Sequence, residues 1–203
     1  LAEYLRKLLH TEEERSILVV GLGNREVTPD ALGPEAVGNL LITRHVIREY
    51  GRAAFEAEQV HRVSGLVPGV MAQTGMETLE IVRGVAQETK PDVIVVIDAL
   101  AARSTRRLNR TIQLSDAGIQ PGSGVGNHRN SLSRETLGVP VVAIGVPTVV
   151  DAATIVYDAT GDREKIAPNL HGMFVTPKDI DETVKSLSFT ISEALNLAME
   201  GRT

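Results

Sequence analysis

The stretch DVIVVIDAL, residues 92–100, is the strongest strand signal in the chain, because five consecutive apolar residues lead to Asp98. A short continuous apolar run is typical of a strand that is buried on both faces of a parallel sheet. SILVVGLG at 16–23 and VPVVAIGVP at 139–147 repeat the pattern. Helix-length segments separate these runs. The sequence therefore predicts right-handed βαβ crossovers and a three-layer α/β/α fold with a mostly parallel central sheet.

Other segments predict the elements around this sheet. Thr28-Pro29-Asp30 has the composition of a helix start: Thr28 can cap the helix, Pro29 suits its first turn, and Asp30 lies at the positive end of the helix dipole. This helix is expected to run through Arg48. Apolar spacing and turn signals indicate a strand at 59–66 and an irregular stretch at 158–172. They also indicate helices at 1–10, at 74–89, after Asp151, and from Thr176-Pro177 to the end of the sequence.

Length and composition limit the classes of protein. With 203 residues, of which 42% are apolar, the chain is expected to form one α/β domain over 1–203. A formal net charge of −5 argues against a nucleic-acid partner. The absence of cysteine excludes disulfides, thiolate catalysis and Cys-based zinc sites. No apolar run approaches the ~20 residues that span a bilayer, so we expect a soluble, intracellular protein without a membrane partner.

Two aspartates follow strong strands at the same predicted edge of the sheet. Alone, Asp98 is better explained as a turn cap, and Asp30 as an acid at a helix start. As a pair they are expected to converge in the crevice that open α/β sheets form beyond the carboxyl ends of their strands. Two neighbouring carboxylates raise one pKa and leave the other group ionised, which suits them to activate water and to protonate a leaving amine.

A long segment at 115–131, rich in Gly, Ser and Asn, connects two of the strands. It includes PGSGVGN at 121–127, whose backbone amides are as consistent with an anion or oxyanion site as with a flexible loop. The stretch from Gly118 to Ser131 is expected to border the crevice and to be more mobile than the strands. The candidates for contact with substrate backbone or oxyanion are Asn24, Gly122, Gly124, Gly126 and Asn127.

Several common catalytic motifs are missing. GLGN at 21–24 departs from the dinucleotide fingerprint because Glu26 stands at the third glycine position, and no G-x-S-x-G elbow occurs. The histidines show no metal-ligand spacing and are expected mostly at the surface; only His128, beside the Gly-rich segment, is a candidate metal ligand. Two alternatives to a cofactor-free peptidase remain open: a metal-binding peptidase in which His128 joins Asp30 and Asp98, and a non-enzymatic anion-binding module.

Several motifs taken together resemble the germination protease family of spore-forming Firmicutes. The clearest are GLGNREVTPDALGP at 21–34, VIDALAAR at 96–103 and ETLGVPVVAIGVPTVVDAATI at 135–155. The resemblance implies an endopeptidase that degrades small acid-soluble spore proteins during germination in the spore core, made as a zymogen and assembled as a homotetramer. It also implies an atypical aspartic mechanism, a fold similar to hydrogenase maturation peptidases, and catalytic roles for Asp30 and Asp98.

Members of that family are longer than this chain. We therefore expect the present sequence to be a fragment or a processed form without upstream residues, and it is short between Tyr157 and Phe174. The features that these differences would affect are the self-processing site and the completeness of the substrate groove.

Overall fold

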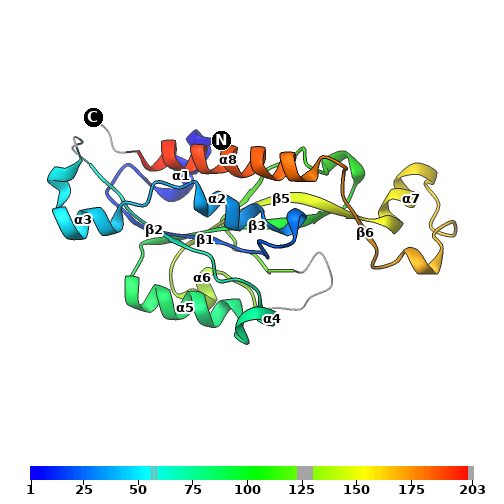
Figure 1. The fold of residues 1–203 in the computed structure, drawn as a ribbon, viewed down its shortest axis with the longest axis horizontal. Coiled ribbons are helices and arrows are strands. Elements are labelled where there is room, and N and C mark those ends of the chain that lie inside the picture. Colours follow the sequence, from blue (N-terminus) through cyan, green and yellow to red (C-terminus); the bar gives the residue numbers. More distant parts are fainter. Residues whose placement is uncertain (56, 58, 123–129, 201–203) are drawn as a thin grey trace.

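The computed structural model describes residues 1–55, 57, 59–122 and 130–200, and its centre is a mixed β-sheet (Figure 1). The strands are β1 (Ser16–Gly21), β2 (Arg62–Leu66), β3 (Val93–Ala102), β4 (Gln113–Ser115), β5 (Val141–Asp151) and β6 (Phe174–Val175). Their order is β2-β1-β3-β5-β4, and β6 also pairs with β5. The four longer strands are parallel, while β4 and β6 run antiparallel to β5. The predicted mostly parallel sheet is confirmed.

Helices cover both faces of the sheet (Figure 1). One face carries α1 (Ala2–Leu9), α2 (Leu32–Gly38) and the long α8 (Ile180–Met199), and the other carries α5 (Thr78–Thr89) and α6 (Arg134–Leu137). The alternation of side chains along β3 explains why both faces need cover: Val95 and Ile97 belong to the core under α8, whereas Ile94 and Val96 belong to the core under α5. The three-layer prediction is therefore confirmed as well.

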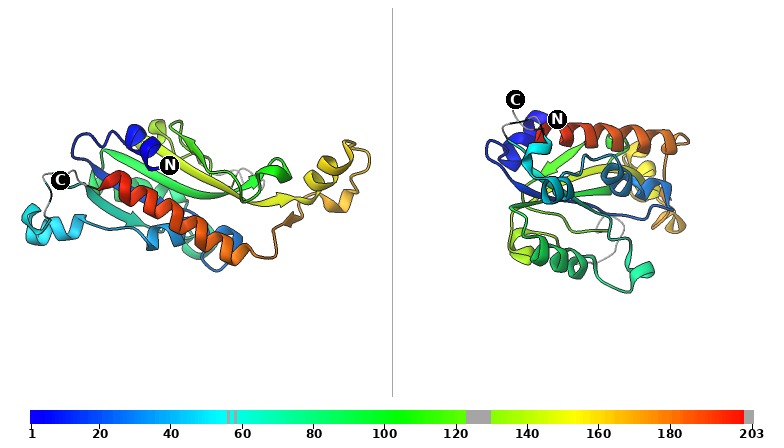
Figure 2. Two further views of the ribbon diagram at one scale, coloured as in Figure 1. Left: turned by 90° about the horizontal axis from the view of Figure 1, so that it is seen from above. Right: turned by 60° about the vertical axis from the view of Figure 1, so that its left-hand side comes forward.

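Three of the remaining elements lie near the two ends of the molecule. Figure 2 shows α7 and β6 extending beyond one end of the molecule, with α3 near the other. The bounds are α3 (Arg44–Tyr50), α4 (Met71–Thr74), α7 (Ala152–Thr160), and the 3₁₀ helices η1 (Thr28–Asp30), η2 (Arg52–Ala54), η3 (Thr105–Arg107) and η5 (Pro168–Leu170). No helix within the described ranges is both long and apolar enough to cross a membrane.

The single helix predicted from Thr28 to Arg48 is wrong. The chain forms η1, α2 and α3 instead, and the N-cap of η1 is Val27 rather than Thr28, without a side-chain capping hydrogen bond. The break before α3 has a tertiary cause. The Thr43 amide donates to the Val63 carbonyl, and the Thr43 hydroxyl accepts from the Val63 amide at 2.9 Å, so this segment is bound to β2 rather than continuing as a helix.

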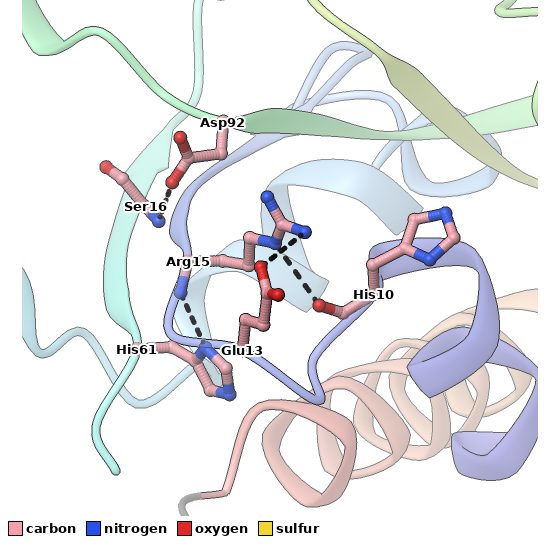
Figure 3. A network of polar contacts seen from close by, with 6 residues as sticks. All are labelled: His10, Glu13, Arg15, Ser16, His61 and Asp92. Atoms are coloured by element: carbon pink, nitrogen blue, oxygen red, sulfur yellow. Dashed lines mark hydrogen bonds and ion pairs between the residues drawn. The ribbon is translucent and has the colours of Figure 1, made fainter.

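A polar network joins the segments that lead into β1, β2 and β3, at the edge of the sheet where these parallel strands begin (Figure 3). The Arg15 amide donates to Nδ1 of His61 at 3.1 Å, and the Asp92 carboxylate accepts from the Ser16 amide at 2.7 Å. His61 is buried, contrary to the surface position expected for the histidines, and burial lowers its pKa. The imidazole therefore acts here as a neutral acceptor that ties β1 to β2.

Candidate active site

Asp98 lies inside β3 rather than at its end, because β3 continues to Ala102. The neighbouring strand β1 is shorter at this edge: it ends at Gly21, which pairs with Ile97. Asp98 is thus the first residue of β3 that no longer pairs with β1. On the other side of β3 it pairs with Gly145 of β5. Its side chain is buried, with only 5% of the residue exposed.

Asp30 follows β1 and closes the short turn η1. Its amide donates to the Val27 carbonyl at 2.7 Å, and its carboxylate oxygen Oδ2 accepts from the Asn24 amide at 2.7 Å. A carboxylate that accepts a backbone N–H is held in place by a charge-assisted hydrogen bond. Asp30 is half-buried, so it is more open to solvent than Asp98.

Both aspartates line one cavity of about 350 Å³ at the carboxyl edge of the parallel strands. Most of the wall is apolar. The described lining residues are Leu22, Gly23, Val27, Pro29, Asp30, Val70, Thr78, Asp98, Ala99, Leu100, Ala101, Gln120, Pro121, Gly122, Thr148, Val149 and Phe174. The structure therefore brings the two predicted aspartates together in a largely apolar pocket.

The two aspartates are electrostatically coupled. The pKa of Asp98 is raised from its ordinary 3.8 to about 8, mainly by burial and in addition by the negative charge of Asp30, while a hydrogen bond with the Ala99 backbone acts in the opposite direction. Asp98 is consequently protonated at neutral pH. A protonated carboxyl next to a second carboxylate is the arrangement in which one group donates a proton while the other accepts one.

The other predicted contact residues have different positions. Gly122 lines the cavity together with Gln120 and Pro121, as expected for the start of the Gly-rich segment. Asn24 is not among the described lining residues; its amide holds Asp30, and its side-chain Oδ1 accepts from the Glu26 amide at 3.0 Å. The remaining candidates lie outside the described residues: Gly124, Gly126, Asn127 and His128.

Sequence reasoning missed a group of wall residues that are distant in the chain. Val70 precedes α4, Thr148 lies in β5 and Phe174 lies in β6. Only Thr148 carries a recognisable signal, namely a hydroxyl in an otherwise apolar strand. The valine and the phenylalanine cannot be distinguished from ordinary core or surface residues without the tertiary structure.

Gly23 determines how closely Asp30 approaches β1. It has a φ of +114°, and a Cβ at this position would lie 1.9 Å from the Asp30 carbonyl oxygen. Gly23→Ala is therefore expected to displace Asp30 and to lower both the free energy of unfolding and the activity. Gly75→Ala is the matched control, because Gly75 also has a positive φ, of +71°, but no atom within 4 Å of its Cβ position.

Urea unfolding of the two variants separates the cost of the strained backbone from the cost of the steric overlap with Asp30. The control should lose ~1–2 kcal/mol from the strained backbone alone, and Gly23→Ala a further ~1–3 kcal/mol from the steric overlap. Equal losses in the two variants would show that the close approach of Gly23 to Asp30 is unimportant.

Comparisons with known proteins identify relatives of this chain. The chain is 43% identical to a germination protease of Caldanaerobacter subterraneus subsp. tengcongensis over 98% of this chain and 71% of the relative. That aligned span of 231 residues exceeds the 203 of this chain, so the relative carries residues without a counterpart here. A germination protease of Bacillus subtilis is 57% identical over 74% of this chain and 40% of its own length.

Two further comparisons concern the fold and the family. A NiFe hydrogenase maturation protease from Thermococcus kodakarensis aligns with a TM-score of 0.46 and 20% identity over 95% of this chain and 98% of that structure. The family model described as germination protease matches residues 1–162. The chain therefore belongs to the germination protease family of peptidases.

Proposed function

We propose that this chain forms a single peptidase domain over 1–203, an endopeptidase whose Asp30 and Asp98 share one proton and activate water. One observation carries the proposal: the two aspartates line the same cavity, and burial together with the charge of Asp30 raises the pKa of Asp98 to about 8. An ionised and a protonated carboxyl then coexist at neutral pH. This is the requirement for a paired acid and base.

The resting protonation assigns a role to each group. The Asp30 carboxylate takes a proton from the water, whose oxygen forms a bond to the peptide carbonyl carbon. Asp98 hydrogen-bonds the carbonyl oxygen and gives its proton to the departing nitrogen as the C–N bond breaks. Asp30 then holds the proton taken from the water while Asp98 is ionised, and transfer of one proton from Asp30 to Asp98 restores the starting state. Because the groups interact, the proton belongs to the pair.

The proposed substrates are small acid-soluble spore proteins, cleaved in the spore core during germination. Membership of the germination protease family supports this assignment, as does the position of both aspartates within the motifs that resemble the family. Synthesis as a zymogen and assembly as a homotetramer are parts of the same proposal. Light scattering coupled to size-exclusion chromatography measures the assembly directly.

A metal-dependent peptidase is the main alternative. Two carboxylates at the sheet edge supply two oxygen ligands, and among the described residues no three His, Asp or Glu side chains lie close enough to hold a metal ion. A third ligand would have to be His128, which lies outside those residues.

Cleavage of a purified small acid-soluble spore protein, with and without EDTA, tests the proposal. We expect cleavage in both samples. Loss of activity in EDTA, with recovery on adding a divalent metal, would favour the metal-dependent enzyme. Absence of cleavage in both samples, with binding of the spore protein or an anion, would favour the non-enzymatic module.

A further inference from the structure

Thr148 is an extra residue in β5, directly beside the cavity. Leu100 of β3 pairs with Pro147 of β5, but Ala101 pairs with Val149, so Thr148 has no partner in the β3–β5 ladder. Such a β-bulge turns a side chain out of the normal alternation, and bulges are frequent next to active sites. Thr148 lies three residues beyond Gly145, the β5 residue that pairs with Asp98.

The side chain of Thr148 connects β5 to the turn that carries Asp30. Its hydroxyl donates to the carbonyl oxygen of Pro29 at 2.6 Å, although the two residues are 119 positions apart in the sequence. Only 1% of Thr148 is exposed, and the residue lines the cavity. A short hydrogen bond in a buried setting is costly to break without a replacement, because it leaves the carbonyl unsatisfied.

A second hydrogen bond fixes the backbone of the bulge. The Thr176 hydroxyl donates to the Thr148 carbonyl at 2.9 Å, and the neighbouring Pro147 carbonyl accepts from the Asn109 amide at 2.8 Å. The bulge is therefore held by the segments that follow β6 and η3. It provides a rigid point of attachment for the Asp30 turn.

We propose that Thr148 is a positioning residue, whose hydroxyl holds the Pro29–Asp30 turn at the distance from β3 that lets the two aspartates act as a pair. This inference rests on the proposed function. Asp98 is fixed by the sheet itself, whereas Asp30 lies on the three-residue turn η1, where its amide donates to the Val27 carbonyl and its carboxylate accepts from the Asn24 amide. The hydrogen bond from the Thr148 hydroxyl links that turn to β5.

Thr148→Val tests the role, because valine keeps the shape of threonine and removes the hydroxyl. We expect kcat for a spore-protein substrate to fall about 10- to 100-fold with little change in KM, since small misplacements of a catalytic group cost this much. The high-pH limb of the activity profile should move to lower pH, because Asp30 then raises the pKa of Asp98 less. Thr148→Ser, which keeps the hydroxyl, should restore most of the rate.

Thr190→Val is the matched control. Its hydroxyl also donates to a backbone carbonyl, that of Ser186 at 2.8 Å, but on the exposed side of α8. This variant should cleave at the wild-type rate. Thr148→Ala removes the same hydroxyl with less bulk and repeats the test independently of how valine packs.

The outcomes distinguish this inference from the proposed function. Wild-type kcat in folded Thr148→Val, or an unmoved pH profile, would overturn the role of Thr148 while leaving the aspartate pair intact. An equal loss in Thr148→Ser would also overturn it, because the hydroxyl would then not be the essential group. Normal cleavage by Asp30→Asn or Asp98→Asn would instead overturn the proposed function.

Discussion

Asp30→Asn and Asp98→Asn are each expected to lower cleavage of a small acid-soluble spore protein by at least ~10² to 10⁴, the usual value of general acid or base assistance. Asparagine nearly preserves the volume of aspartate, but it neither accepts nor releases the proton that the mechanism moves. The remaining aspartate cannot take both roles, so the two single variants should be similarly inactive. Initial rates at neutral pH, with enzyme in excess for the variants, measure the effect.

Loss of activity must be separated from loss of structure. Asp158→Asn is the matched control, because the Asp158 carboxylate also accepts a backbone N–H, from Thr105 at 2.7 Å, but is exposed and does not line the cavity. We expect this variant to cleave normally. If a folded Asp30→Asn or Asp98→Asn protein cleaves within a few-fold of wild type, that aspartate has no part in proton transfer.

The second large effect concerns stability rather than activity. In the unfolded chain Asp98 titrates near its ordinary 3.8, whereas in the folded protein its pKa is about 8. Between these values the folded state binds one more proton than the unfolded state, so the contribution of Asp98 to stability is present at low pH and is lost as the pH rises towards 8. Asp98→Asn does not titrate. Relative to this variant, the wild type should lose ~1.4 kcal/mol of unfolding free energy per pH unit.

Urea unfolding of the wild type and Asp98→Asn at pH 5, 6 and 7 measures that difference. The comparison between variants cancels groups that titrate in both proteins. Asp158→Asn again serves as the control and should run parallel to the wild type over this range. A constant difference between wild type and Asp98→Asn would mean that Asp98 is ionised in the folded protein throughout, which contradicts the proposed resting state.

The sequence was sufficient to predict the central strands of the sheet and the meeting of Asp30 and Asp98 at one cavity. Continuous apolar runs such as Val93–Ile97 can be buried on both faces only in the middle of a sheet, so β1, β3 and β5 were recognisable without tertiary information. The parallel arrangement then placed Asp30 and Asp98 at one edge. Both indeed line one cavity, although Asp98 precedes the end of its strand by four residues.

Other features depend on contacts between distant segments. The break before α3 arises because Thr43 bonds to β2, and the strands β4 and β6, of three and two residues, are too short to show any alternation. The bulge at Thr148 is defined only by the register of β5 against β3. None of these features has a local sequence pattern, because the partner that causes each one lies tens of residues away.

Titration of the Asp98 carboxyl carbon by NMR, in the wild type and in Asp30→Asn, tests the pairing of the two aspartates most directly. We expect the wild-type pKa of Asp98 near 8, from burial and from the charge of Asp30. In Asp30→Asn the pKa of Asp98 should fall, yet stay above 3.8, because burial remains. A wild-type pKa near 4, or a raised pKa that Asp30→Asn leaves unchanged, would show that the two carboxyl groups do not share a proton.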